Sequence, residues 1–89
     1  MAHKLFIVSH TMEEARGVAW LFGKGRDEYV WVDRPEKLYG FDRGVPLIVY
    51  DSATRMESLF DILRVAVERS FMVFNLTRVH HNQLKRMYG

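Results

Sequence analysis

Four short runs of the chain are apolar at adjacent positions, and they constrain the fold more than any other feature. Leu5–Val8 is apolar on both alternating faces, which is typical of a strand covered on both sides. Similar runs predict strands over Glu28–Asp33, Val45–Asp51 and Phe71–Leu76. Strands buried on both faces are typical of a parallel sheet, so we expect an α/β fold.

The first predicted helix follows the first strand. Thr11 and Glu14 have the spacing of a capping box, and Gly23 is a typical helix end. The apolar positions of this segment share one helical face, which we expect to be buried: Met12, Ala15, Val18, Ala19 and Phe22.

The second predicted helix has the strongest helical periodicity in the chain. Thr54 and Glu57 repeat the capping-box spacing at its start. The core-facing side is predicted to hold Met56, Leu59, Phe60, Leu63, Ala66 and Val67. A fainter helix is expected in the terminal stretch RVHHNQLKRMYG.

These elements alternate as strand, helix, strand, strand, helix, strand, helix, with a Pro- and Gly-containing linker that can hold one short helical turn. Eighty-nine residues suit one domain. Right-handed crossovers then predict a single small α/β domain with an open, mainly parallel four-stranded sheet and helices on both faces. We expect the strand order 2-1-3-4.

Composition excludes several chemistries. The chain has no cysteine, which rules out disulfides, thiolate catalysis and zinc-thiolate sites. Its net charge of +2 is too small to argue for nucleic-acid or membrane binding by itself. His80 and His81 are adjacent without ligand spacing, so we predict no metal site and no cofactor. The N-terminal stretch has no signal-peptide or membrane-span pattern, and a cytoplasmic protein is expected.

Polar residues follow every expected strand, at the edge where open parallel sheets bind ligands. The same residue types also cap helices, so Asp51 has two open interpretations: a working acid or a helix-start residue. Basic residues gather toward the C-terminus. The candidate ligand or nucleic-acid site therefore consists of Ser9, His10, Asp51, Arg55, Asn75, Arg78, Lys85 and Arg86.

A second candidate site lies on the outward face of the first helix. Trp20 is the kind of large side chain that anchors interfaces, and Gly17 is costly inside a helix unless another group approaches closely. The predicted partner-binding residues are Arg16, Gly17, Trp20 and Lys24. The alternative is that the terminal helix packs over Trp20.

Three segments also resemble parts of a known family. LIVYDSA resembles the acidic strand of P-loop nucleotide hydrolases such as helicases and phage terminases, FMVFNLTR resembles the strand that ends on their sensor residue, and FIVSHTMEEARGVAW is similar to a helicase segment that contacts nucleic acid. The resemblance implies that Asp51 is the magnesium-binding acid and that Asn75 or Thr77 is the sensor. Since the chain has no GxxxxGK[ST] loop, it implies a reduced core without hydrolysis.

Three functional hypotheses follow. The first is a small non-enzymatic protein that binds a protein partner or a second copy through the Trp20 face, encoded by a phage or mobile element. The second is a nucleic-acid-binding module that uses strand-end and C-terminal basic residues. The third is a nucleotide-binding or hydrolytic enzyme centred on Asp51 and His10. No membrane partner is expected.

Overall fold

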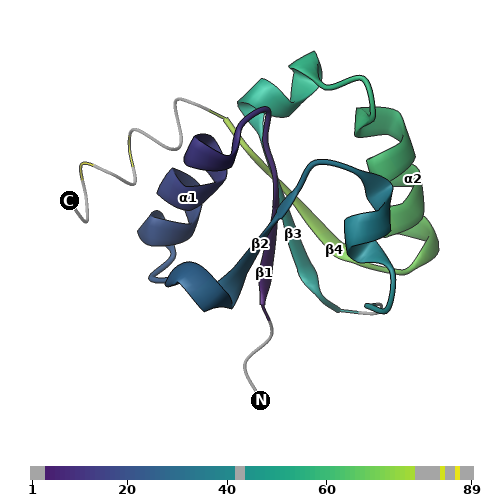
Figure 1. The fold of residues 1–89 in the computed structure, drawn as a ribbon, viewed down its shortest axis with the longest axis horizontal. Coiled ribbons are helices and arrows are strands. Elements are labelled where there is room, and N and C mark those ends of the chain that lie inside the picture. The colour runs from purple at the N-terminus through teal and green to yellow at the C-terminus, as the bar shows by residue number, and fades with distance from the viewer. Residues whose placement is uncertain (1–3, 42–43, 78–82, 84–85, 87–89) are drawn as a thin grey trace.

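The computed structural model describes residues 4–41, 44–77, 83 and 86, and it contains all four expected strands (Figure 1). They form one sheet in the order β2-β1-β3-β4, and every pair is parallel. The predicted α/β class and strand order are thereby confirmed. The strands are β1 Leu5–Val8, β2 Tyr29–Val32, β3 Pro46–Tyr50 and β4 Met72–Leu76.

The central strand is β1, which pairs with β2 on one side and with β3 on the other. Phe6 lies between Val30 and Leu47, and Val8 lies between Val32 and Val49. Every residue of β1 is buried. Its continuous apolar run, rather than an alternating one, is what a strand with neighbours and cover on all sides requires.

Helix α1, Met12–Leu21, begins and ends as its sequence predicts. The Thr11 backbone amide donates to Glu14 Oε1 at 3.1 Å, and the Glu14 amide donates to Thr11 Oγ1 at 3.3 Å, which completes the capping box. At the other end Gly23 has a φ of +70°, and the Lys24 amide donates to Ala19 O at 2.9 Å in a Schellman motif.

The buried face of α1 is narrower than predicted. Ala15, Val18 and Ala19 are fully buried, but Met12 and Phe22 at the ends of the stripe are exposed. The helix therefore buries only the apolar residues of its middle turns against the sheet.

Helix α2, Leu59–Glu68, starts later than the sequence suggested. Thr54 lies in a short 3-10 helix, η3 Asp51–Arg55, where its hydroxyl donates to Asp51 O at 3.1 Å. Extended backbone at Met56 then separates η3 from α2. Ser58 precedes α2, and its hydroxyl donates to Asp33 O at 3.1 Å. The predicted Thr54–Glu57 cap is therefore wrong.

The predicted buried face of α2 is also wrong in part. Ile62, Val65 and Ala66 are buried, whereas Phe60 is 85% exposed and Val67 is 72% exposed. Because apolar residues cover more than half of this helix's circumference, periodicity alone could not decide which part faces the sheet.

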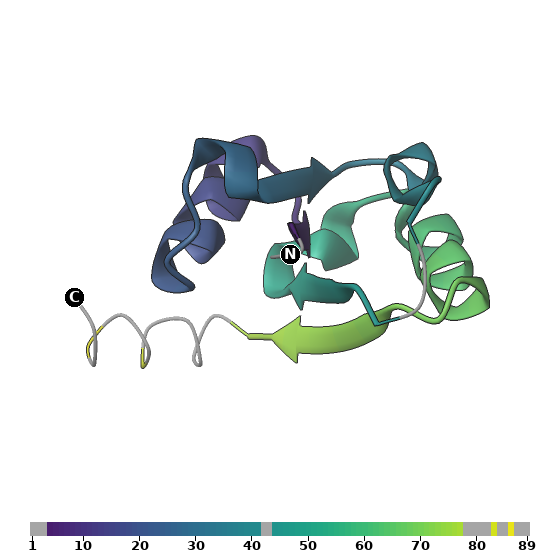
Figure 2. The same ribbon diagram turned by 90° about the horizontal axis from the view of Figure 1, so that it is seen from below.

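The helices cover opposite faces of the sheet and create two cores (Figure 2). The core under α2 contains residues from all parts of the chain: Phe6, Val8, Val32, Leu38, Val45, Leu47, Ala53, Ile62, Val65, Ala66 and Phe71. The core under α1 is smaller: Leu5, Ile7, Ala15, Val18, Ala19, Ile48, Tyr50 and Leu76.

Two further 3-10 helices flank β2. They are η1 Arg26–Glu28 and η2 Pro35–Leu38, the second being the expected turn in the linker. The predicted terminal helix lies outside the described residues except at Gln83 and Arg86. In the described part of the chain no helix has the length and apolar character needed to cross a membrane.

Candidate functional site

A hydrogen-bond network fills the carboxyl end of the sheet between β1 and β3, where the strand order reverses. The buried Ser9 hydroxyl donates to Thr11 O at 2.7 Å. The His10 amide donates to Ser52 Oγ at 3.1 Å, and Ser52 Oγ donates to Glu14 Oε1 at 2.8 Å. The network ties the ends of both strands to the start of α1.

Glu14 is the centre of this network. Partial burial acts to raise the pKa of Glu14, but hydrogen bonds from Ser52 and Thr11, together with the nearby His10, outweigh it, so the pKa is lowered below its ordinary value. The negative carboxylate therefore occupies the amino end of α1, where an anionic ligand would otherwise be attracted.

The other strand-end candidates are more scattered. Asp51 and Arg55 are exposed at the two ends of η3, and no described residue forms a hydrogen bond or ion pair with the Asp51 carboxylate. Asn75 lies within β4, beside Val49, instead of following the strand as expected. Arg86 is exposed, while Arg78 and Lys85 lie outside the described residues.

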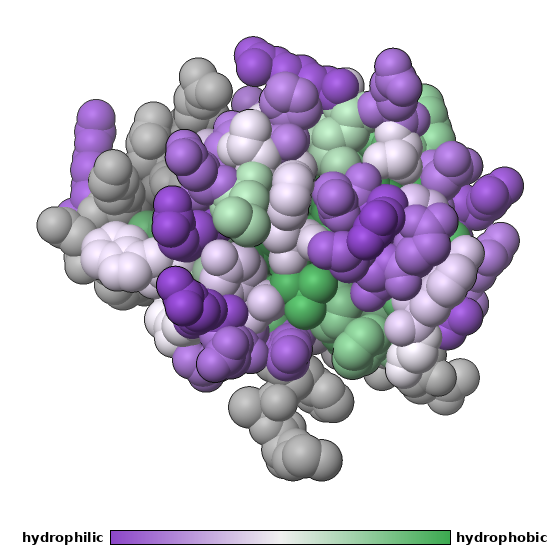
Figure 3. All heavy atoms as spheres, in the orientation of Figure 1, coloured by the Kyte–Doolittle hydropathy of each residue, from purple (hydrophilic) through white to green (hydrophobic). Residues whose placement is uncertain are grey.

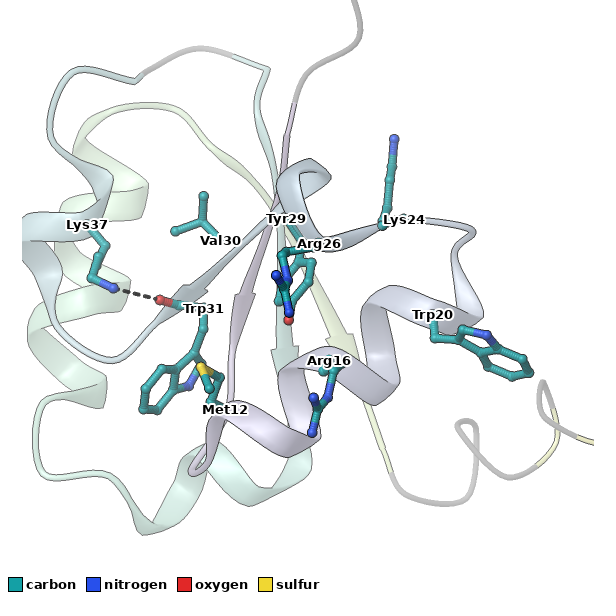
Figure 4. A pocket seen from close by; sticks show the side chains of 10 residues that line it. Met12, Arg16, Trp20, Lys24, Arg26, Tyr29, Val30, Trp31 and Lys37 are labelled. Atoms are coloured by element: carbon teal, nitrogen blue, oxygen red, sulfur yellow. Dashed lines mark hydrogen bonds between the residues drawn. The ribbon is translucent and has the colours of Figure 1, made fainter.

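A groove of about 620 Å³ runs between α1 and β2 (Figure 4). Figure 3 shows this side of the molecule, where hydrophilic side chains gather on both flanks and apolar ones lie between them. The volume is within the range of about 300 to 1,000 Å³ that is typical of ligand sites. Its lining residues come from α1, from the turn after it, from β2 and from η2: Met12, Arg16, Trp20, Lys24, Gly25, Arg26, Tyr29, Val30, Trp31 and Lys37.

The groove is positively charged. No carboxylate lines it, and Arg16, Lys24 and Arg26 form no ion pair with any described residue. Lys37 is engaged by the protein itself: its Nζ donates to Trp31 O at 3.3 Å and lies 3.5 Å from the Asp33 carboxylate. Three cations thus remain available to a ligand.

The aromatic side chains of the groove differ in how far they are buried and held by the core. Tyr29 and Trp31 pack partly against the core under α1, and Trp31 Nε1 donates to Ser9 O at 3.1 Å. Trp20 is 63% exposed and points outward from the far end of α1 (Figure 4). The groove therefore combines a fixed aromatic floor with one free indole at its rim.

The sequence identified only part of this groove. Of the predicted partner-binding residues, Arg16, Trp20 and Lys24 line it, and the half-buried Gly17 does not. The main residues missed were Arg26, Tyr29 and Trp31. The signal was the alternate placement of two aromatic residues in β2, which becomes informative only once β2 is known to be an edge strand.

No family model, no curated protein and no solved structure matches this chain. Among the residues that the structure describes, no three His, Asp or Glu side chains come together as a metal site.

Proposed function

We propose that this protein is a small non-enzymatic binding module whose groove between α1 and β2 takes single-stranded nucleic acid. The observation that carries the proposal is the combination of Arg16, Lys24 and Arg26, which form no ion pair with the described part of the chain, with the exposed ring of Trp20. Cations that follow a backbone of phosphates, beside an aromatic ring on which bases stack, are the usual components of single-strand binding sites.

A single strand suits the groove better than a duplex. Stacking on Trp20 requires an unstacked base, which a single strand supplies without melting base pairs. Helix α1 also belongs to the segment that resembles a nucleic-acid-contacting part of helicases, which supports the same partner class.

The test is fluorescence anisotropy with a labelled single-stranded oligonucleotide at several salt concentrations. Three phosphate contacts predict that log affinity falls with log salt with a slope of about −2. Trp20→Ala should weaken binding by about 1 to 3 kcal/mol, because one stacked base is lost. Arg16→Gln should make the slope shallower by about 0.7.

The matched control is Arg64→Gln on α2. Arg64 is exposed and lies 3.5 Å from Asp61, far from the groove in sequence and on the helix that covers the other face. Its substitution removes the same charge but should leave the affinity unchanged. Absence of binding at low salt, or equal effects of the two arginine substitutions, would contradict the proposal.

A protein partner is the second candidate, because an exposed tryptophan also anchors protein interfaces. Such a partner would be acidic, since the groove is basic. An acidic peptide that binds more tightly than the oligonucleotide at the same salt concentration would assign the groove to a protein. A cytoplasmic location and a phage or mobile-element origin stay predictions.

A further inference from the structure

The edge strand β4 is unusually open for a natural sheet margin. Within the described residues it pairs only with β3, and no ribbon lies beyond it in Figure 2. Its residues Met72–Leu76 include no charge and no proline, and four of the five are exposed. Natural edge strands normally carry charges, prolines or bulges that prevent pairing with another chain.

The opposite edge strand, β2, is protected against pairing with another chain. Charged residues stand on both sides of β2, with Asp27 and Glu28 before it and Asp33 and Arg34 after it. Lys37 donates to the Trp31 carbonyl of the strand itself. By contrast, no charged residue stands within Ser70–Thr77, so β4 and its immediate neighbours lack the adjacent charges that flank β2.

The apolar flank of α2 lies on the same side of the molecule. At the end of α2, the guanidinium of the C-cap residue Arg69 lies 5.3 Å from the Tyr39 ring centre, in the loop after η2. Phe60 and Val67 lie on the exposed side of α2, opposite the buried Ile62, and the half-buried Leu63 lies beside them. The ribbon of β4 passes beside α2 in Figure 2. Val73 lies on the α2 face of the sheet, whereas Met72 and Phe74 lie on the α1 face together with Leu76. The open edge of β4 therefore carries apolar side chains on both faces, and together with the exposed apolar residues of α2 it is called the apolar margin.

We infer that this apolar margin is the interface of a homodimer in which β4 pairs antiparallel with β4 of a second copy. A two-fold axis at Phe74 would place Phe74 opposite its own counterpart and Met72 opposite Leu76. These three residues point to the same face, since they alternate along the strand, so all cross-strand pairs on that face are apolar.

Self-pairing suits β4 because a two-fold axis pairs the strand only with residues of the same strand. A charged strand would repel itself there, and β4 carries no charge. The dimer would be one eight-stranded sheet, and it would leave the groove beside β2 open at each outer margin.

The exposed apolar area reaches the lower end of what such a dimer needs, which is about 600 Å² per partner. The exposed parts of Phe60, Val67, Met72, Val73 and Phe74 amount to roughly 600 Å² per copy, since large apolar side chains offer about 150 to 250 Å² each. A standard interface takes about 800 Å² from each partner, and the open backbone edge and Leu63 would add to the side-chain area. The inference does not depend on what the groove binds.

The first experiment is sedimentation equilibrium at micromolar to submillimolar protein. One chain has a mass of 10.5 kDa, so the dimer should appear at twice 10.5 kDa, or 21 kDa. Phe60→Glu should raise the dimer dissociation constant at least about tenfold, because it places like charges on an 85% exposed position of the interface. Phe74→Arg should do the same, and Phe60→Glu decides the question if Phe74→Arg does not fold.

The matched control is Trp20→Glu, which places the same charge on a 63% exposed position at the other margin and should leave the dimer intact. A monomer at every concentration would overturn the inference, and so would a dimer that is insensitive to Phe60→Glu.

Cross-linking then tests the register. Because the chain has no cysteine, Phe74→Cys introduces the only thiol, and the two-fold axis would bring two copies of it into disulfide range. Asn75→Cys, one position off the axis, should cross-link much more slowly. Equal rates would exclude an axis at Phe74.

Discussion

Gly23 and Ser70 occupy the same position in the motifs that end the two helices. Each follows the helix by two residues with a positive φ, +70° for Gly23 and 59° for Ser70. The hydrogen bonds correspond as well: the Lys24 amide donates to Ala19 O, and the Phe71 amide donates to Ala66 O, both at 2.9 Å. Helix α1 thus ends with glycine, which prefers the left-handed backbone conformation, whereas α2 ends with serine, which does not.

Ser70→Gly should therefore stabilise the protein. A left-handed backbone costs a residue with a Cβ about 1 to 2 kcal/mol, partly offset by the greater freedom of glycine in the unfolded chain, so we expect a gain of about 0.5 to 1 kcal/mol. The reciprocal change Gly23→Ser should cost a similar amount, since nothing lies within 4 Å of an added Cβ at Gly23. Urea unfolding of both variants measures the pair, and changes of the same sign would contradict the correspondence.

Glu14→Gln should lower stability at neutral pH by about 1 kcal/mol, because three charge-assisted hydrogen bonds to one carboxylate oxygen become neutral ones. The pKa of Glu14 is lower in the folded chain than its ordinary value of 4.5, so the carboxylate's contribution is complete above that pH and is lost as the pH falls through the folded-state pKa. The difference between wild type and variant should thus shrink on acidification.

The control for this prediction is Glu13→Gln, the exposed neighbour, which makes no hydrogen bond with described side chains. Its unfolding free energy at neutral pH should stay within about 0.5 kcal/mol of wild type. A Glu14 effect that is constant across the acid range would contradict the network.

Ile62 and Phe60 test the corrected face of α2. Ile62 is fully buried, so Ile62→Ala should cost about 2 to 5 kcal/mol, and Ile62→Val about 0.5 to 1.5 kcal/mol if the first variant does not fold. Phe60→Ala should cost less than about 0.5 kcal/mol in dilute protein, where the monomer dominates. Equal costs would restore the face that the periodicity suggested.

Trp31→Phe should test the floor of the groove. The change keeps an aromatic ring but removes the donor to Ser9 O, which should cost about 1 kcal/mol or more because Ser9 is buried. Thermal unfolding followed by circular dichroism measures the loss. An unchanged midpoint would show that the indole hydrogen bond contributes little to positioning β2.

The sequence predicted those parts of the fold that depend on local pattern. Continuous apolar runs located the strands, and the Thr11–Glu14 pair located the start of α1 because both partners lie within one helical turn. The strand order followed from general rules of parallel sheets.

The incorrect predictions concern features that depend on residues distant in the sequence. The Ser58 hydroxyl donates to Asp33 O, 25 positions earlier in the chain. The local capping pattern at Thr54 therefore could not predict where α2 begins. The groove was recognised only from α1, since the exposure of Tyr29 and Trp31 depends on β2 being an edge strand. Both depend on tertiary placement, which local spacing does not encode.

The central position of β1 has a consequence for biosynthesis. On the ribosome β1 emerges before both of its neighbours, and nearly forty residues separate Val8 from the start of β3. At ordinary synthesis rates the four apolar residues of β1 wait roughly 2 to 8 s for that partner. During this interval the nascent chain presents the most buried strand of the finished sheet to solvent, so efficient production should depend on chaperones that hold apolar segments and on the pace of translation through α1 and β2.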